Sequence, residues 1–299
     1  MIAQVGSLPV PRAEKIPLGE DAVLPEVKPS DEIPKLIHQI YRAGAVPSAL
    51  VDHVEHVRRI NPGWQHTLYN EENIVDFISQ HYGADILHSY ESINPGYGSA
   101  RADFFRYLLM YYHGGVYLDI KSSMTSPLDE LIKPDDRFIL SQWRNGPGEV
   151  HEGYGLWKDL AYVPGGDFQQ WHIIASPGHP FLRRVIENVL AKLTKYDVKK
   201  HGVGQIGVNR VTGEIAYTEA IFPMLGADLP GIRRVSNESD IGLQYSVTTG
   251  LAHVGLFASN YRTRTDPIVL QPGIRGVAAR AYCLGYYSVR KRLKKLLRR

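Results

Sequence analysis

The residues best suited to chemistry gather in one stretch near the middle of the chain. Asp103 and Arg106 are three residues apart, so they share one stripe of a helix. The apolar run Val116 to Ile120 suits a buried strand, and it places Asp119 near the carboxyl end of that strand. In open α/β sheets this end of a strand is where ligands bind, so Asp119 is a candidate binding residue.

Two elements must position these side chains, a helix before a glycine pair and a strand after it. From Phe104 to Tyr112 apolar residues recur at three- and four-residue spacing, which predicts an amphipathic helix. His113, Gly114 and Gly115 are expected to end it, because glycine readily adopts the left-handed conformation that closes many helices. The stretch is therefore predicted to fold as helix, turn and strand.

The order of these residues resembles the DxD sugar-transferase families, of the glycosyltransferase family 32 kind. That group contains yeast initiating mannosyltransferases, bacterial capsule glycosyltransferases and, more distantly, the catalytic domains of clostridial glucosylating toxins. Its pattern, A-x-x-D-x-x-R-x-x-x-L-x-x-x-G-G-x-Y-x-D-x-D, is matched here by Arg101, Asp103, Arg106, Gly114, Gly115, Tyr117 and Asp119. Lys121 stands where the family has its second Asp.

Strand-like and helix-like segments alternate along the rest of the chain, which favours a parallel sheet with crossover helices. Predicted strands cover residues 33–41, 64–69, 116–120 and 137–143, and predicted helices cover 48–60, 72–80, 181–193 and 217–225. Gln169 to Phe181 also resembles a family segment, as does Thr212-Gly213, with Glu214 in place of a proline. The resemblance implies an α/β fold of the GT-A type, a Rossmann-like nucleotide-sugar-binding sheet flanked by helices.

Length and composition set the organisation of the chain. With 299 residues, 43% of them hydrophobic, it can bury a substantial core. We expect an extended proline-rich strap at 1–32, the GT-A domain at 33–275 and a basic amphipathic helix at 276–299. A single cysteine excludes an internal disulfide framework and a cysteine-based zinc site.

The termini suggest where the protein works. No run approaches the roughly 20 apolar residues of a membrane span, and the start of the chain lacks the apolar core of a signal peptide, so a cytoplasmic location is expected. Seven of the last ten residues are basic, and Tyr286 to Arg299 places leucines and Val289 at helical spacing among them. This composition suits a helix lying on an anionic membrane surface. A solvated helix and a nucleic-acid-binding tail are the alternatives, but the remainder of the chain, with 27 basic and 31 acidic residues, gives no reason to expect a nucleic-acid partner.

The resemblance implies a UDP- or GDP-sugar donor and names the residues that bind it. They are Ile40, Tyr41, Arg101, Asp103, Arg106, Tyr117 and Asp119. Tyr41 replaces the family's tryptophan near the nucleotide base and keeps a stacking face. A plainer explanation stays open for the preceding His38 and Gln39, which would satisfy buried backbone groups.

The loop Arg144 to Gly166 is long for a connector, and such loops are often functional, so we expect it on the acceptor side. The acceptor-side candidates are Trp143, Tyr154 and Trp171. Acidic residues near this loop are as apt to be solvated as to act in the reaction, so no catalytic base is named; they are Glu149, Glu152, Asp159 and Asp167. For His179 we expect bracing of a turn rather than chemistry.

Lys121 leaves three hypotheses open. A departing diphosphate gains negative charge, which DxD families neutralise with Mn²⁺ or Mg²⁺, and an ammonium cannot coordinate such an ion. In the first hypothesis Lys121 itself pairs with the diphosphate and the enzyme is metal-independent. In the second its side chain points away, and Asp119 with His253 and water holds the ion. In the third the site binds nucleotide without catalysis.

A plain alternative for Asp103 and Arg106 is an exposed helix pair worth a few tenths of a kcal/mol. The ordered block together with two further matching segments argues against coincidence. We therefore expect a retaining glycosyltransferase, with Asp119 and Lys121 as its catalytic residues. It would move a hexose to a glycan or glycolipid acceptor in polysaccharide or glycoconjugate biosynthesis, from the cytoplasm or peripherally on a membrane. The alternative is a catalytically inactive nucleotide-sugar-binding or scaffold protein.

Overall fold

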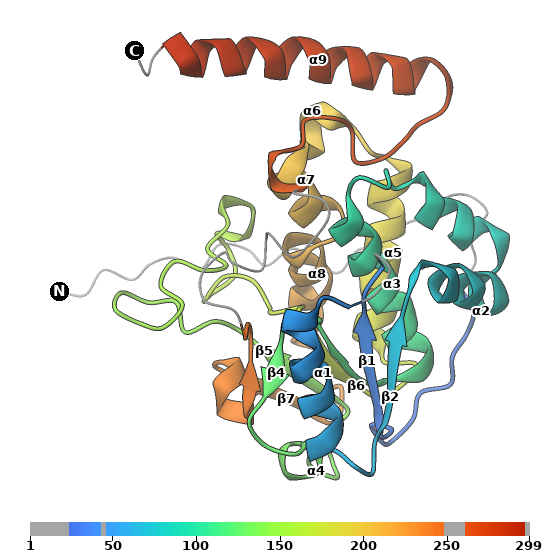
Figure 1. Ribbon diagram of the computed structural model, residues 1–299, viewed down its shortest axis with the longest axis vertical. Coiled ribbons are helices and arrows are strands. Elements are labelled where there is room, and N and C mark those ends of the chain that lie inside the picture. Colours follow the sequence, from blue (N-terminus) through green and yellow to red (C-terminus); the bar gives the residue numbers. More distant parts are fainter. Residues whose placement is uncertain (1–23, 43–45, 248–260, 297–299) are drawn as a thin grey trace.

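The computed structural model describes residues 24–42, 46–247 and 261–296 (Figure 1). Within these residues a six-stranded sheet, in the order β2-β1-β3-β6-β5-β7, forms the centre of the molecule. Its strands are β1 (Leu36–Ile40), β2 (Gln65–Tyr69), β3 (Gly115–Leu118), β5 (Phe138–Ser141), β6 (His172–Ala175) and β7 (Ile232–Val235). A separate short pair joins β4 (Ser123–Met124) to β8 (Leu243–Gln244) in antiparallel register.

One strand of the large sheet runs against the other five. β1 pairs parallel with β2 and β3, and β5 pairs parallel with β7, but β6 is antiparallel to both β3 and β5. The predicted α/β class is confirmed, but the favoured parallel sheet is only mostly parallel, because β6 runs in the opposite direction. Because β6 is reversed, its amino end lies at the edge where β1, β3 and β5 have their carboxyl ends.

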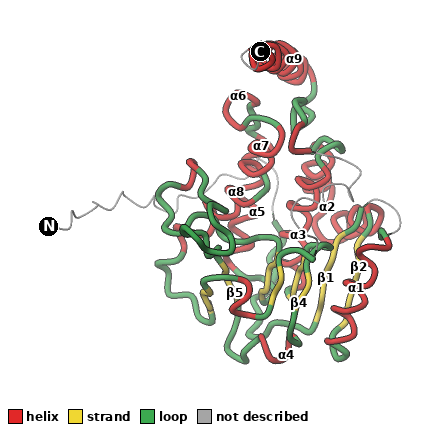
Figure 2. The backbone as a smooth tube through the Cα atoms, turned by 60° about the vertical axis from the view of Figure 1, so that its left-hand side comes forward, coloured by secondary structure: helices red, strands yellow, loops and turns green. Residues whose placement is uncertain are grey.

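Helices cover both faces of the sheet (Figures 1 and 2). The α-helices are α1 (Ser48–Ile60), α2 (Glu71–Ser92), α3 (Gly98–His113), α4 (Leu128–Leu131), α5 (Pro180–Thr194), α6 (Val198–His201), α7 (Gly204–Val211), α8 (Glu214–Ile221) and α9 (Gly273–Leu296). Short 3₁₀ turns are η1 (Lys158–Leu160), η2 (Phe222–Met224), η3 (Glu238–Ile241) and η5 (Tyr261–Thr263). Tyr117 packs into the cluster formed with α2, α3, α5 and α8, while its neighbours Val116 and Leu118 pack toward α1 and α4. This alternation follows from the two-residue period of a strand.

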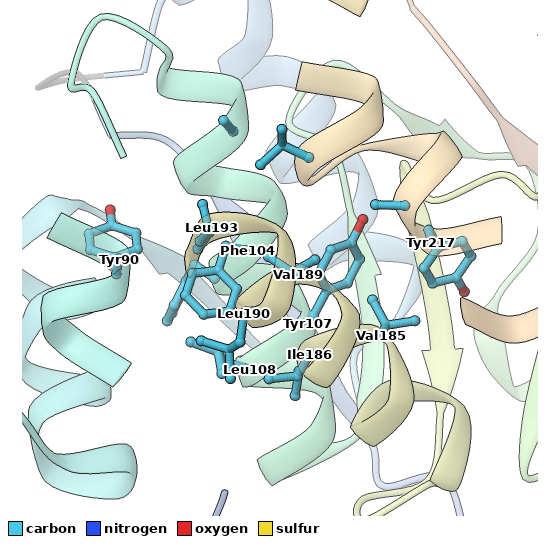
Figure 3. Packing of buried hydrophobic residues seen from close by; sticks show 14 of the residues in the cluster. Tyr90, Phe104, Tyr107, Leu108, Val185, Ile186, Val189, Leu190, Leu193 and Tyr217 are labelled. Atoms are coloured by element: carbon cyan, nitrogen blue, oxygen red, sulfur yellow. The ribbon is translucent and has the colours of Figure 1, made fainter. Parts of the chain in front are cut away.

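Helix α3 is the centre of the larger cluster. Tyr107 lies among Val185 and Val189 of α5 and Tyr217 of α8 (Figure 3), and the rings of Tyr107 and Tyr217 stack with centroids 5.7 Å apart. The Tyr107 hydroxyl donates to the Thr212 carbonyl at 2.8 Å. The position of the predicted helix is confirmed, but it is buried on most of its circumference rather than on one stripe.

The glycine turn after α3 behaves as its sequence predicts. Gly114 and Gly115 have φ of 64° and 92°, in the region that side chains disfavour. A Cβ at Gly114 would collide with Pro177, and one at Gly115 with the backbone of Leu36. The chain therefore passes between α3 and β3 without steric conflict, and Asp119 follows directly after β3.

Other boundaries differ from the predicted ones. The predicted helix 72–80 is the first part of α2, which continues past a kink at Gly83. Helix α9 begins at Gly273, ahead of the expected 276, and lies at the edge of the molecule (Figure 1). Of the expected strap only residues 24–32 are described; there Leu24 is buried, and the Ser30 N–H donates to Pro177. Within the described residues, no helix combines the length and apolar character that crossing a membrane requires.

Candidate active site

A cavity of about 810 Å³ lies where β1, β3 and β5 end and β6 begins. Two of its walls carry most of the chemistry. The charged wall consists of Asp103, Arg106, Tyr117, Asp119 and Lys121. The aromatic wall consists of Trp143, Tyr154, Trp157, Asp167, Trp171 and Tyr245.

Arg106 holds the charged wall together. Its guanidinium lies 3.1 Å from Asp103 and 3.2 Å from Asp119, and it donates to the Gln170 carbonyl at 2.8 Å. It also lies over the Tyr117 ring, 4.6 Å from the centroid, in a cation–π contact. The side chains of Asp103 and Arg106 are each only 5% exposed, so an exposed helix pair is the wrong description of them.

Asp103 is a buried structural acid of this wall. Gln170 Nε2 donates to its carboxylate at 3.3 Å and Thr212 Oγ1 donates at 3.1 Å. Burial raises the pKa of Asp103 to about 7, against the attraction of Arg106. Sequence reasoning did not identify Gln170 or Thr212, although both lie in segments that it singled out.

Asp119 is the carboxylate of this wall that a ligand can reach. Its side chain is 23% exposed, and its backbone N–H donates to the Trp171 carbonyl at 2.8 Å, which fixes the chain after β3. The Tyr117 hydroxyl donates to Oδ1 at 2.9 Å. Position and exposure together fit the binding role predicted for Asp119.

Lys121 does not point away from Asp119. Its Nζ lies 4.0 Å from Asp119 Oδ2 and donates to the Tyr245 hydroxyl at 3.0 Å. The same ammonium lies 4.1 Å from the centroid of the Tyr245 ring. Tyr245, which the sequence gave no reason to choose, therefore holds Lys121 at the cavity.

The aromatic wall contains all three acceptor-side candidates, Trp143, Tyr154 and Trp171. Asp167 organises it, because the indole N–H groups of Trp143 and Trp157 donate to its two oxygens at 2.7 and 2.6 Å. Burial raises the pKa of Asp167 to about 6.

The other acids named near the loop lie elsewhere. Asp159 pairs with Arg210 at 2.8 Å, and the carboxylates of Glu149 and Glu152 accept from loop N–H groups. None of the three lines the cavity, so of the two alternatives left open by the sequence, the one without a role in the reaction fits their placement. Asp167 is buried at the cavity instead.

Glu214, at the start of α8, contributes an acid that the sequence did not mark for chemistry. It lines the cavity at the position where the resembling family has a proline. Burial, with the nearby Asp167, raises the pKa of Glu214 to about 7. In the sequence, Glu214 was notable only because it replaces the proline of the family pattern.

Arg101, His38 and Gln39 contact other parts of the protein and do not line the cavity. Arg101 pairs with Glu71 at 2.9 Å, donates to the Ile93 carbonyl at 2.9 Å and does not line the cavity. His38 Nε2 donates to the Gly114 carbonyl at 3.1 Å, and Gln39 Nε2 donates to the Asp119 carbonyl at 3.5 Å. The plainer explanation of His38 and Gln39 therefore fits their placement.

The remaining candidates are placed as follows. Ile40 and Tyr41 line the cavity, although the Tyr41 ring is largely buried against α1. His179 Nδ1 accepts from the Phe181 N–H at 3.2 Å and caps α5, as a bracing role requires. His253 lies outside the described residues.

Comparison with known proteins identifies the region that builds the charged wall. Residues 47–138 match the family described as "Glycosyltransferase sugar-binding region containing DXD motif". This part of the chain is thus similar to DXD-type glycosyltransferases. The resemblance inferred from the residues is confirmed for this region, and the mostly parallel α/β sheet around it is consistent with the predicted GT-A type of fold.

Two relatives of the chain are mannosyltransferases by name. The chain is 30% identical over 164 residues to inositol phosphoceramide mannosyltransferase 1 of Schizosaccharomyces pombe, covering 53% of this chain and 43% of that protein. It is 29% identical over 212 residues to the initiation-specific alpha-1,6-mannosyltransferase of Candida albicans, covering 64% and 53%. The matches thus span about half the length of these relatives or less. A solved structure called PaToxG Glycosyltransferase aligns over 64% of this chain and 70% of its own, with a TM-score of 0.43 and 14% identity.

The divalent cation implied by the DXD motif does not fit the described part of this site. No group of three His, Cys, Asp or Glu side chains that could hold a metal occurs among residues 24–42, 46–247 and 261–296. Asp119 faces Arg106 and Lys121, and both oxygens of Asp103 already accept hydrogen bonds. Hard divalent cations need several oxygen ligands, and this wall offers one reachable carboxylate next to two cations.

Proposed function

We propose that the protein is a glycosyltransferase that moves a hexose from a UDP- or GDP-sugar to a glycan or glycolipid acceptor. The observation that carries this proposal is the set of Asp103, Arg106 and Asp119, joined at 3.1 and 3.2 Å, in the wall of a cavity at the ligand-binding edge of the sheet. The match to a sugar-binding family over residues 47–138 includes all three residues.

In the reaction, the bond between the anomeric carbon and the β-phosphate oxygen breaks and its electron pair stays on the diphosphate. The acceptor hydroxyl oxygen bonds to the anomeric carbon, and its proton leaves with the nucleoside diphosphate or to water. Asp119 is positioned to accept hydrogen bonds from donor hydroxyls, and Arg106 holds it in place. We further propose that the anomeric configuration is retained, as the resemblance implies.

The aromatic wall suits the acceptor. Trp143, Tyr154 and Trp171 offer apolar ring surface beside the carboxylates of the cavity, and the Trp171 indole N–H has no partner among the described residues. Sugar-binding pockets need this mixture, because sugars present both C–H faces and hydroxyl groups. The names of the relatives favour mannose as the hexose and make GDP-mannose the first donor to test.

The test is a panel of UDP- and GDP-sugars, measured by thermal shift and by turnover with glycan and glycolipid acceptors. Each donor is assayed with Mn²⁺ and with EDTA, and proton NMR of the product gives its anomeric configuration. We expect one donor both to stabilise the protein and to be turned over with retention. Stabilisation without turnover on every acceptor would favour the alternative, an inactive nucleotide-sugar-binding protein. Absence of any nucleotide response would contradict the proposal.

Helix α9 supports a further proposal, that the acceptor is met at an anionic membrane surface. Ile274, Val277 and Leu284 are exposed and share one face of the helix, while Ala279 and Cys283 on the opposite face are buried. The sequence from Arg290 to Arg299, which begins inside this helix, has seven basic residues among ten. An exposed apolar face with basic residues nearby is the composition of interfacial helices.

Vesicle co-sedimentation tests this proposal. We expect binding to vesicles that contain phosphatidylserine, weak binding to pure phosphatidylcholine, and loss of binding in Leu284→Asp. Val150→Asp is the matched control, because Val150 is an exposed apolar residue of similar exposure in a distant loop. Equal binding by Leu284→Asp and the control would contradict a membrane role for α9. The cytoplasmic location expected from the sequence stays a prediction.

A further inference from the structure

The site has a fixed cation of its own at the position where the DXD pattern places a metal ligand. We propose that the Lys121 ammonium binds the donor's diphosphate in place of a divalent metal ion, so that donor binding is metal-independent. This inference rests on the proposed donor-binding function and says how the same site handles the negative charge of the donor.

The ammonium is directed toward the cavity, not toward bulk solvent. The Lys121 side chain is 11% exposed and lines the cavity together with Asp119. It donates to the Tyr245 hydroxyl at 3.0 Å and lies 4.1 Å from the centroid of the same ring. One neighbouring side chain thus fixes the ammonium by both a hydrogen bond and a cation–π contact.

Among the described residues, no carboxylate lies closer than 4.0 Å to this ammonium, so its charge is available for an anion. Its closest partner, the Tyr245 hydroxyl, is neutral. Asp119 lies at 4.0 Å and already has closer contacts, to Arg106 at 3.2 Å and to the Tyr117 hydroxyl at 2.9 Å. A phosphate oxygen would therefore give Lys121 a strong charge-assisted hydrogen bond without breaking an existing close ion pair.

The chain on both sides of Lys121 is held in place. The Val247 N–H donates to the Lys121 carbonyl at 2.9 Å, and Ser122 Oγ donates to the Tyr245 carbonyl at 2.7 Å. Next to this contact, strand β4 pairs with strand β8. The Tyr245 ring in turn contacts the rings of Trp143 and Trp171, with centroids 5.2 and 5.5 Å apart. The cation is therefore positioned before a ligand arrives, which is the condition for efficient stabilisation of developing charge.

A metal ion would be disfavoured at the same place. An ion bound to Asp119 would be close to both the ammonium and the Arg106 guanidinium, and like charges repel strongly in a partly buried site. A lysine ammonium is a compact point charge and a common phosphate ligand, so it can take over the electrostatic part of the metal's role.

The experiment measures binding of UDP and GDP, and of UMP and GMP, by titration calorimetry in EDTA and in Mn²⁺. The proteins are the wild type, Lys121→Met and the matched control Lys133→Met, which removes an exposed lysine outside the cavity. We expect the wild type to bind its nucleoside diphosphate in EDTA, with less than about a threefold change on adding Mn²⁺. Loss of one charge-assisted contact should weaken the diphosphate roughly ten- to a hundred-fold in Lys121→Met. The monophosphate, which lacks the β-phosphate, should change little, and the control should match the wild type.

Two further variants keep the proposal testable if Lys121→Met folds poorly. Lys121→Asp restores the DxD pattern, so its diphosphate binding should be lost in EDTA and recovered in Mn²⁺. Tyr245→Phe removes the hydrogen bond that positions the ammonium, and should weaken the diphosphate a few-fold while leaving the melting temperature and monophosphate affinity unchanged.

The outcomes separate this inference from the proposed function. Diphosphate binding by the wild type only in Mn²⁺, or equal losses of mono- and diphosphate affinity in Lys121→Met, would overturn the role of Lys121 and leave the transferase intact. EDTA-resistant binding by Lys121→Asp would also count against it. Failure of the wild type to bind any nucleotide in either medium would overturn the donor-binding function itself, and this inference with it.

Discussion

The two walls of the cavity stabilise buried acids in different ways. In the charged wall Asp103 is compensated by a cation, because Arg106 lies 3.1 Å away and also contacts Asp119. In the aromatic wall Asp167 forms no ion pair with any described residue, and two neutral indole N–H groups donate to its oxygens at 2.7 and 2.6 Å. Removing a partner therefore leaves uncompensated charge in the charged wall, but only a missing hydrogen bond in the aromatic wall.

The difference also concerns how the walls are assembled. The charged wall comes from α3 and the strand that directly follows it, so its residues are close in sequence. The aromatic wall joins the loop after β5, the segment before β6 and the distant Tyr245. We expect substitutions of the buried pair Asp103 and Arg106 to affect folding as well as donor binding, and substitutions of Asp167 and the two tryptophans that it holds to act chiefly on the acceptor.

Arg106→Met should have the largest effect. It leaves Asp103 buried without its cation, and breaking a buried ion pair typically costs about 3–5 kcal/mol of unfolding free energy. Urea denaturation followed by circular dichroism measures this. Arg58→Met is the matched control, because Arg58 makes an exposed helix pair with Glu55 worth roughly 0.5 kcal/mol or less. A loss of less than about 1 kcal/mol of unfolding free energy in Arg106→Met would mean that the ion pairs of the charged wall do not stabilise the fold.

Asp119→Asn should separate function from folding within the charged wall. The side chain keeps its shape and can still accept from Tyr117, but it loses the charge that strengthens hydrogen bonds to donor hydroxyls. We expect turnover to fall by about ten- to a hundred-fold, with the melting temperature nearly unchanged. Donor turnover and thermal shift are measured on the same preparation. Wild-type turnover would remove Asp119 from the proposed reaction.

Asp167→Asn probes the aromatic wall. The amide can accept from one of the two indole N–H groups but presents its own donors to the other, which costs about 1–3 kcal/mol. We expect a raised KM for the acceptor, unchanged donor affinity and a smaller loss of stability than in Arg106→Met. An equal loss of donor and acceptor affinity would show that the two walls do not act separately.

Glu214→Gln should change how the free energy of unfolding depends on pH. Burial raises the pKa of Glu214 from the ordinary 4.5 to about 7, so the folded protein keeps a proton that the unfolded chain has already lost. The free energy of unfolding should therefore fall as the pH rises from about 4.5 to about 7. Removing the titrating group should reduce this fall by roughly 2 kcal/mol, measured by urea denaturation at pH 5 and pH 7. An unchanged pH profile in Glu214→Gln would place the titration on other groups, with Asp103 the next to substitute.

The sequence by itself determined the charged wall in outline. Helical spacing placed Asp103 and Arg106 together, the glycine pair ended the helix, and the apolar run placed Asp119 at the end of a strand. These are local properties, because periodicity and φ preferences act between residues a few positions apart.

Only the tertiary structure decided which distant groups meet these residues. The reversed direction of β6 brings Gln170 and Trp171 to the ligand edge, and Tyr245 reaches Lys121 across 124 positions of sequence. Arg101, adjacent to the predicted site in sequence, turns instead to Glu71. Strand direction and the partners of a buried charge depend on how the whole chain packs, because each buried polar group must find a partner among residues that sequence spacing does not bring together.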